Sequence, residues 1–198
     1  MELLRDGLTF DLLGIAPGLS LSIPAPCHRF GLAKDSFSGA KEAIGLFPGP
    51  HLVEGSHTLP VLRTLMALAV DLVRELPAVE TILWTPARAA LSRVLFASVT
   101  ETWLDGGAFP APGLIGFMET ATGGLITDGL AFFIGQELEL EPALSTDRVS
   151  ASRLATRIAD RLVGGTEPFF PETLVIEGWP PLLLQQDGSP SRIRATLA

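Results

Sequence analysis

Alternating apolar and polar residues near the N-terminus predict a β-hairpin. Residues 8–12 (LTFDL) and 19–23 (LSLSI) both alternate, so each segment would place its apolar side chains on one face of a strand. Between them, residues 16–18 (APG) favour a turn, because proline fixes one turn dihedral and glycine tolerates the other. We therefore expect an N-terminal hairpin subregion within residues 1–30.

A long segment with helical periodicity follows in the middle of the chain. It runs from an N-cap at Thr58 to Leu76, with Pro60 in the first turn and Pro77 as the stop. Its few polar residues fall within one narrow arc, which predicts a central helix buried on nearly all sides. A shorter helix is expected at residues 35–45, capped by Asp35 or Ser36.

The next helical segment ends at Asp105-Gly106, and its start has two alternatives. Thr85-Pro86 is one cap, and Ser92 is the other. The spacing of apolar residues predicts an inward stripe made of Leu91, Val94, Leu95, Ser98, Val99 and Thr102.

The last helical segment begins after Ser145, Thr146 and Asp147, all of them good cap residues, and ends at Gly164-Gly165. A left-handed cap is expected at the glycine pair. The predicted inward face is Ala151, Leu154, Ala155, Ile158, Ala159 and Leu162.

Short apolar or alternating runs predict the remaining strands. We place them at residues 51–54, 79–84, 114–120, 125–127, 136–141, 173–177, 182–186 and 192–197. This order of elements predicts an α+β fold, in which a largely antiparallel mixed sheet is packed by three main helices. The chain has no clear linker, so we expect residues 1–198 to form a single α+β domain.

Composition narrows the classes of function. Hydrophobic residues make up 47% of the 198 and charged residues only 18%, which allows a large core and favours self-association. The formal net charge of −8 argues against nucleic acid and anionic membranes as partners. A single cysteine excludes an internal disulfide, and we find no leader or spanning segment, so we expect a cytoplasmic protein.

Several short cues between residues 45 and 145 resemble one bacterial family. They include the run Thr127-Asp128-Gly129-Leu130, followed by Gly135-Gln136-Glu137-Leu138-Glu139, and a strand that ends in Trp84. The chain resembles the family catalogued as domain of unknown function 4261. The resemblance implies a bacterial origin and an α+β fold, and it supplies no catalytic residue.

An acidic ladder, Glu137, Glu139 and Glu141, occupies alternate positions of one predicted strand. Alternate side chains share a face about 6.6 Å apart, too far for three carboxylates to hold one bare cation easily. We interpret the ladder first as a solvated strand face. A competing interpretation pairs it with the basic stripes at residues 153, 157 and 161 and at residues 192 and 194, across the fold or a homodimer. A cation site is the third.

The histidines and the cysteine offer a different chemistry. Cys27, His51 and His57 could supply three zinc ligands, and a Cys27 nucleophile would need His51 or His57 as its base. Cys27 and His28 are adjacent, so on an extended chain they point to opposite faces. Ordinary surface histidines and a half-buried thiol are the simpler interpretation.

The residues therefore favour a non-enzymatic protein that binds another protein or a second copy of itself. We expect Glu137, Glu139, Arg153 and Arg157 to form the interaction surface, with no cofactor, because no phosphate loop or dinucleotide motif is present. The alternative is an enzyme, or a protein that binds a metal or a small ligand, built around Cys27, His28, His51 and His57.

Overall fold

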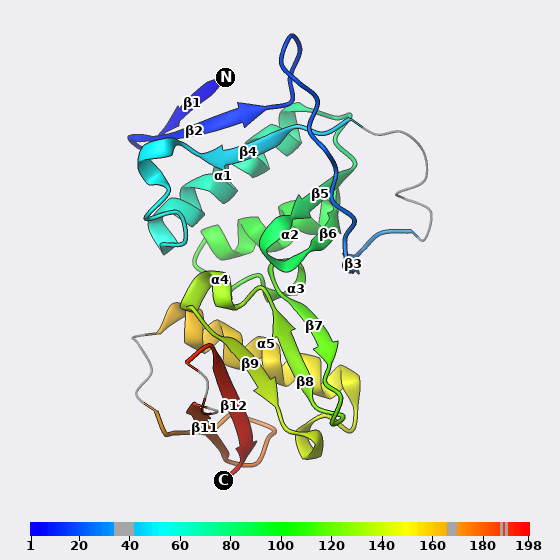
Figure 1. Ribbon diagram of the computed structural model, residues 1–198, viewed down its shortest axis with the longest axis vertical. Coiled ribbons are helices and arrows are strands. Elements are labelled where there is room, and N and C mark those ends of the chain that lie inside the picture. The colour runs from blue at the N-terminus through cyan, green and yellow to red at the C-terminus, as the bar shows by residue number, and fades with distance from the viewer. Residues whose placement is uncertain (34–41, 166–169, 187, 189) are drawn as a thin grey trace. The chain divides into compact units, whose positions relative to one another are not determined.

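The chain forms two compact units in the computed structural model (Figure 1). The structure describes residues 1–33, 42–165, 170–186, 188 and 190–198. Unit 1 is Met1–Leu83 with Ala90–Gly107, and unit 2 is Trp84–Ala89 with Ala108–Ala198. The expectation that residues 1–198 form a single domain stays a prediction. Most of the helix expected at residues 35–45 lies outside the described residues.

A β-hairpin opens unit 1, but its strands are β1 (Glu2–Arg5) and β2 (Leu8–Leu13). Asp6 and Gly7 join them with φ values of 51° and 78°. Two positive φ values are typical of a type I′ turn, whose twist matches that of paired strands. The expected partner strand at residues 19–23 is wrong, because Asp-Gly directly after a strand is the stronger hairpin signal and the chain has already turned there.

A three-stranded sheet and a long helix form the first layers of unit 1. β4 (Gly45–Pro48) pairs antiparallel with β2, giving the order β1-β2-β4. α1 (Leu59–Glu75) lies against this sheet, where Phe10 and Leu12 are buried (Figure 1). The prediction of this helix is confirmed. Its burial is more one-sided than expected, with these buried residues: Val61, Leu62, Leu65, Met66, Val70 and Val73.

The segment between β4 and α1 corrects another expectation. Residues 51–54 were expected to form a strand, and the chain instead forms the 3-10 helix η1 (Pro50–Leu52) and a run of turns. Pro50 occupies a first-turn position, where its fixed φ suits a helical start and its missing N–H costs nothing. Thr58 stands at the N-cap of α1 as predicted, although its hydroxyl donates to the carbonyl of Gly55 at 2.7 Å.

A second small sheet has the order β3-β6-β5, from His28–Phe30, Ala89–Ser92 and Thr81–Trp84. The 3-10 helix η2 (Thr85–Ala87) separates β5 from β6. α2 (Arg93–Leu104) therefore begins after Ser92, whose Oγ accepts from the N–H of Leu95 at 3.3 Å. The alternative start at Ser92 is confirmed, and the start at Thr85-Pro86 is wrong because η2 ends at Ala87 and β6 lies between η2 and α2.

The buried face of α2 is not the predicted stripe. Phe96, Thr100 and Trp103 are buried, whereas Val94 is 79% exposed. The two aromatic rings carry more apolar surface than the valine, so burying their face removes more of it from water. The helix ends as expected at Gly106, whose φ of 93° allows the left-handed turn.

Unit 2 is built on one six-stranded sheet with the order β10-β11-β12-β9-β8-β7. The strands are β7 (Gly116–Glu119), β8 (Leu125–Asp128), β9 (Glu137–Leu140), β10 (Glu172–Leu174), β11 (Leu182–Gln186) and β12 (Arg192–Leu197). All neighbours pair antiparallel except β12 and β9, which are parallel. The predicted hairpins β7–β8 and β11–β12 are confirmed. The strand expected at residues 173–177 is β10, which begins one residue earlier and is shorter.

α5 (Arg148–Gly164) covers one face of this sheet (Figure 1). All six residues of its predicted inward face are buried, so this prediction is confirmed. Asp147 is the N-cap and accepts from the N–H of Ser150 at 2.9 Å. Gly165 ends the helix in an extended conformation, so the expected left-handed cap is wrong. Shorter elements complete unit 2: α3 (Ala111–Leu114), α4 (Ala131–Ile134) and η3 (Pro142–Leu144).

The fold class is α+β, as predicted, with α1, α2 and α5 as the three main helices. The strands divide into three mostly antiparallel sheets, where the sequence analysis expected one. The six-stranded sheet of unit 2 carries the acidic ladder, and the β1-β2-β4 sheet of unit 1 carries three exposed apolar side chains, Leu4, Leu13 and Phe47.

Candidate functional site

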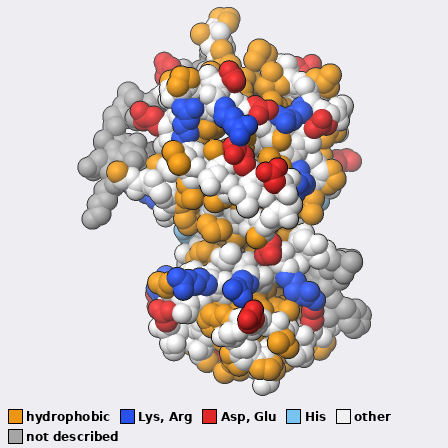
Figure 2. All heavy atoms as spheres, turned by 180° about the vertical axis from the view of Figure 1, so that it is seen from behind, with side chains coloured by type: hydrophobic (Ala, Val, Ile, Leu, Met, Phe, Trp, Pro, Cys, Tyr) orange, Lys and Arg blue, Asp and Glu red, His pale blue; other side chains and the backbone are white. Residues whose placement is uncertain are grey.

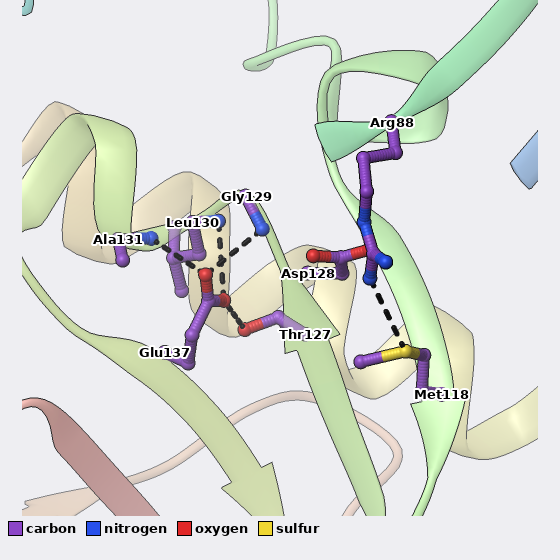
Figure 3. Close-up of polar contacts among 8 residues, drawn as sticks. All are labelled: Arg88, Met118, Thr127, Asp128, Gly129, Leu130, Ala131 and Glu137. Carbon is purple, nitrogen blue, oxygen red and sulfur yellow. Dashed lines mark hydrogen bonds and ion pairs between the residues drawn. The ribbon is translucent and has the colours of Figure 1, made fainter. Parts of the chain in front are cut away.

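Glu137, the first residue of β9, points its carboxylate at the backbone that leads into α4 (Figure 3). Oε1 accepts from the N–H groups of Gly129 at 2.8 Å and Ala131 at 3.1 Å. Oε2 accepts from the N–H of Leu130 at 3.2 Å and the hydroxyl of Thr127 at 2.5 Å. The first N–H groups of a helix have no partner within it, so Glu137 is an internal cap. The solvated-face prediction is wrong for this residue.

The side chain of Thr127 links β8 to β9 beyond the point where their main-chain pairing ends. The last paired residues are Ile126 and Glu139. Past them, the hydroxyl of Thr127 accepts from the N–H of Leu138 at 2.8 Å while it donates to Glu137. Thr127 is only 1% exposed, and its hydrogen bond with the N–H of Leu138 is buried. The two strands are thus held together by a side chain where their backbones separate.

Asp128 and Gly129 hold the neighbouring turn. Asp128 Oδ2 accepts from Arg88 Nη2 at 2.7 Å and Nε at 3.2 Å, and Met118 sulfur lies 3.7 Å from the same guanidinium (Figure 3). Gly129 has a φ of 100°, and a Cβ there would lie 2.8 Å from Cα of Ala87. With Leu130 fully buried, every residue of the run 127–130 has an internal structural role.

Glu139 lies between two arginines of the neighbouring parallel strand. Arg192 Nη1 is 2.8 Å from one carboxylate oxygen, and Arg194 Nη2 is 3.6 Å from the other. Only 5% of Glu139 is exposed, so its expected solvation is also wrong. The basic stripe at residues 192 and 194 does meet the acidic ladder across the fold, as one of the three interpretations expected. Glu141 accepts from the N–H of Leu197 at 2.7 Å.

The other basic stripe, Arg153, Arg157 and Arg161, lies on the solvent side of α5, and we call it the arginine row. All three residues are exposed, and Figure 2 shows Lys and Arg side chains in a line over this helix. Arg161 pairs with Glu172 at 2.8 Å. Arg157 reaches only the carbonyl of Glu177 at 3.4 Å. Among the described residues, no ion pair within 4.0 Å neutralises Arg153 or Arg157.

The structure does not bring the four predicted surface residues together. Leu138 and Leu140 point to the face of the sheet that α5 covers, so Glu139 points to the opposite face. Arg153 and Arg157 point away from the sheet on the far side of α5. The helix and the sheet therefore separate the glutamates from the arginine row.

Cys27 and the histidines do not form the expected site. Nε2 of His51 lies 3.0 Å from the hydroxyl of Thr9 on β2, and Cys27 is exposed. Within the described part of the chain, which includes Cys27, His51 and His57, no three His, Cys, Asp or Glu side chains gather to hold a metal ion. The three-ligand interpretation is therefore wrong: Cys27 directly precedes β3, whereas His51 and His57 lie in the segment between β4 and α1.

Sequence reasoning missed the outer face of the three-stranded sheet of unit 1. Leu4 is 73% exposed there, and Leu13 and Phe47 are each 44% exposed. The signal that could have found this face is Asp6-Gly7, since a hairpin at residues 2–13 places positions 4 and 13 on one side.

Comparisons with family models, with curated proteins and with solved structures found no match to this chain. The resemblance stated from the sequence therefore stays a prediction. In the described residues, no helix combines the length and the apolar character that crossing a membrane requires.

Proposed function

We propose that this chain is a non-enzymatic, cytoplasmic protein-binding module, and that the arginine row on α5 receives an acidic segment of another protein. The observation that carries the proposal is the pair of exposed arginines, Arg153 and Arg157, which lack a neutralising carboxylate within ion-pair distance in the described residues. They stand on a rigid helix in a chain whose net charge is −8. A local basic surface on an acidic protein selects an acidic partner by charge complementarity.

The partner class follows from the balance of charges. Nucleic acid and anionic membranes are extended polyanions, and a net charge of −8 repels both over the range of the Debye length. A short acidic segment of a protein needs only the local field of the row. Two guanidinium groups four residues apart suit carboxylates at the same spacing on a partner helix.

The glutamates first assigned to this surface have a different part in the proposal. Glu137 and Glu139 accept internal hydrogen bonds and ion pairs, so they support the sheet on which α5 packs. The resemblance to the family catalogued as domain of unknown function 4261 fits this division. The residues that carry the resemblance include Thr127, Gly129 and Glu137, which hold β8, β9 and the turn into α4 together and do not lie in the arginine row.

The test uses a fluorescent, alanine-rich helical peptide with glutamates at every fourth position, and a glutamine version of that peptide as its control. Binding by anisotropy should favour the glutamate peptide and weaken as salt rises. The double variant R153Q/R157Q should lose most of this binding, whereas R153K/R157K, which keeps both charges, should retain it. Thermal unfolding should be alike in all three proteins, because both side chains are exposed.

Two results would overturn the proposal. One is equal binding of the glutamate and glutamine peptides. The other is full binding by R153Q/R157Q, which would place the peptide elsewhere on the molecule.

A further inference from the structure

Unit 1 has a free strand edge, which is a separate feature from the arginine row on α5. β1 is the outermost strand of the order β1-β2-β4, and among the described residues it pairs with β2 alone (Figure 1). Opposite residues of antiparallel strands alternate between hydrogen-bonded and non-hydrogen-bonded pairs. Arg5 and Leu8 flank the two-residue turn, and the N–H of Leu12 donates to the carbonyl of Met1 at 2.7 Å. Odd-numbered residues of β1 therefore bond to β2.

The even-numbered residues, Glu2 and Leu4, point their N–H and C=O groups away from the sheet. Within the described residues, no main-chain hydrogen bond uses these groups. Such a row of unused donors and acceptors is a template for another strand.

The opposite edge of the same sheet is blocked. The N–H of Gly49 donates to the carbonyl of Thr9 at 2.9 Å, so alternate residues of β4 bond to β2 at positions 45, 47 and 49. The main-chain groups of Leu46 and Pro48 then point to the outer edge of the sheet, where proline has no N–H to donate. Proline on an edge is a common protection against strand addition, and β1 has none.

We propose that two copies of this chain join through their β1 edges, in antiparallel pairing about a twofold axis, to make one continuous six-stranded sheet. The proposal goes beyond the binding function of α5 and does not depend on it. Residues directly opposite one another must lie on the same face, so even positions pair with even positions.

Three registers satisfy this condition, and one is best. Pairing Glu2 with Leu4 of the second copy, in both directions, forms four main-chain hydrogen bonds and sets Leu3 opposite its own copy. Pairing Leu4 with Leu4 gives only two bonds in extended chain and sets Glu2 against Asp6, which already adopts the turn conformation with a φ of 51°. Pairing Glu2 with Glu2 places like charges opposite each other.

The exposed side chains next to the edge support a second copy as the occupant. Leu4 is 73% exposed alone, and in the favoured register it lies diagonal to Leu4 of the second copy, within reach for contact. A four-residue strand buries little surface, so the interface belongs to the small, transient class. We therefore expect a concentration-dependent equilibrium between monomer and dimer.

Sedimentation equilibrium over a range of concentrations tests the surface. Leu4→Glu should abolish the dimer, because in the favoured register it sets a carboxylate directly opposite Glu2 of the second copy, twice across the interface. Val94→Glu is the matched control: Val94 is 79% exposed on α2, and this change should leave the dimer intact. Leu4→Pro removes only an outward N–H and should also give a monomer, with unchanged circular dichroism showing that it folds.

Cross-linking tests the register. In a Cys27→Ser background, Leu3→Cys should form an intermolecular disulfide readily, because non-hydrogen-bonded pairs place Cα atoms about 4.5 Å apart, within disulfide range. Leu4→Cys should cross-link poorly. A monomer at every concentration, or a dimer that persists in Leu4→Glu, would overturn the proposal. Preferential cross-linking of Leu4→Cys would overturn the register.

Discussion

The sheets of the two units treat their polar and apolar groups in opposite ways. In unit 2, the carboxylates of Glu137 and Glu139 are turned to internal amides, a hydroxyl and arginines. In unit 1, Leu4 is 73% exposed on the open edge strand β1, and Phe47 is 44% exposed on β4, on the same face of the sheet. Charged residues, which are typical of a surface, thus have structural roles in unit 2, whereas apolar residues, which are typical of a core, are exposed in unit 1.

Even the edge strands differ between the two sheets. β7, one edge in unit 2, ends in Glu119, which forms an ion pair with Arg148 at the start of α5. The other edge, β10, has only three residues. The difference suggests that unit 2 is closed as a structural body, while unit 1 keeps one edge for pairing.

Gly129→Ala should have the largest effect on the closed sheet. The new Cβ would meet backbone of Ala87 at 2.8 Å and force a side chain into a left-handed conformation. Strain and overpacking together should lower the free energy of unfolding by about 3 kcal/mol in urea denaturation. Gly135→Ala is the control, since Gly135 also has positive φ but open space around it, and should cost only about 1 kcal/mol. Equal losses would show that the contact with Ala87 is not what requires glycine.

Glu137→Ala should come next. It leaves three N–H groups and the hydroxyl of Thr127 without their acceptor, and the partly buried site should lose about 2–3 kcal/mol of unfolding free energy. Glu141→Ala removes the acceptor of one hydrogen bond, from Leu197, and should lose about 0.5–1 kcal/mol. A loss at Glu137 no larger than at Glu141 would contradict its role as an internal cap.

Arg192→Ala should have a moderate effect. It leaves the buried carboxylate of Glu139 with Arg194 alone, 3.6 Å away, and should lower the unfolding free energy by about 1–2 kcal/mol. Arg153→Ala on the exposed row should change it by less than about 0.5 kcal/mol. Equally small losses for Arg192→Ala and Arg153→Ala would contradict a stabilising role for the ion pair between Arg192 and the buried Glu139.

Asp147→Asn should show the smallest effect, and only through pH. Hydrogen bonds from the side chain and the backbone of Ser150 lower the pKa of Asp147 from its usual 3.8. A carboxyl whose pKa is lower in the folded state stabilises the fold above its unfolded pKa and loses that contribution as pH falls through the folded pKa. The difference in Tm between the wild type and Asp147→Asn should therefore be present at neutral pH and shrink below pH 3.8. A difference that is independent of pH would contradict it.

The sequence predicted best those elements whose pattern is long and local. α1 and α5 span several turns, so their apolar periodicity, stops and caps identified them nearly to the residue. The predicted inward stripe of α2 was wrong for two reasons. The sequence left two alternative starts for the helix, and β6 excludes one of them. The helix also buries the larger rings of Phe96 and Trp103 and leaves Val94 exposed.

The roles of the acidic-ladder residues could not be predicted from local sequence patterns. Glu137 caps residues that precede it by six to eight positions through a turn, and Glu139 meets Arg192 from a strand 53 positions later. Alternation within one strand says which side chains share a face, but the neighbours on that face come from strand order, which the sequence did not predict.

Amide hydrogen exchange, measured residue by residue at low and high protein concentration, tests the contrast between the two sheets most directly. We predict that the amides of Gly129, Leu130 and Ala131 are protected at both concentrations, because the carboxylate of Glu137 accepts them within one molecule. The amides of Glu2 and Leu4 should exchange freely in dilute protein and become protected as concentration rises. Protection of Glu2 and Leu4 that does not change with concentration, or rapid exchange at residues 129–131, would contradict the account.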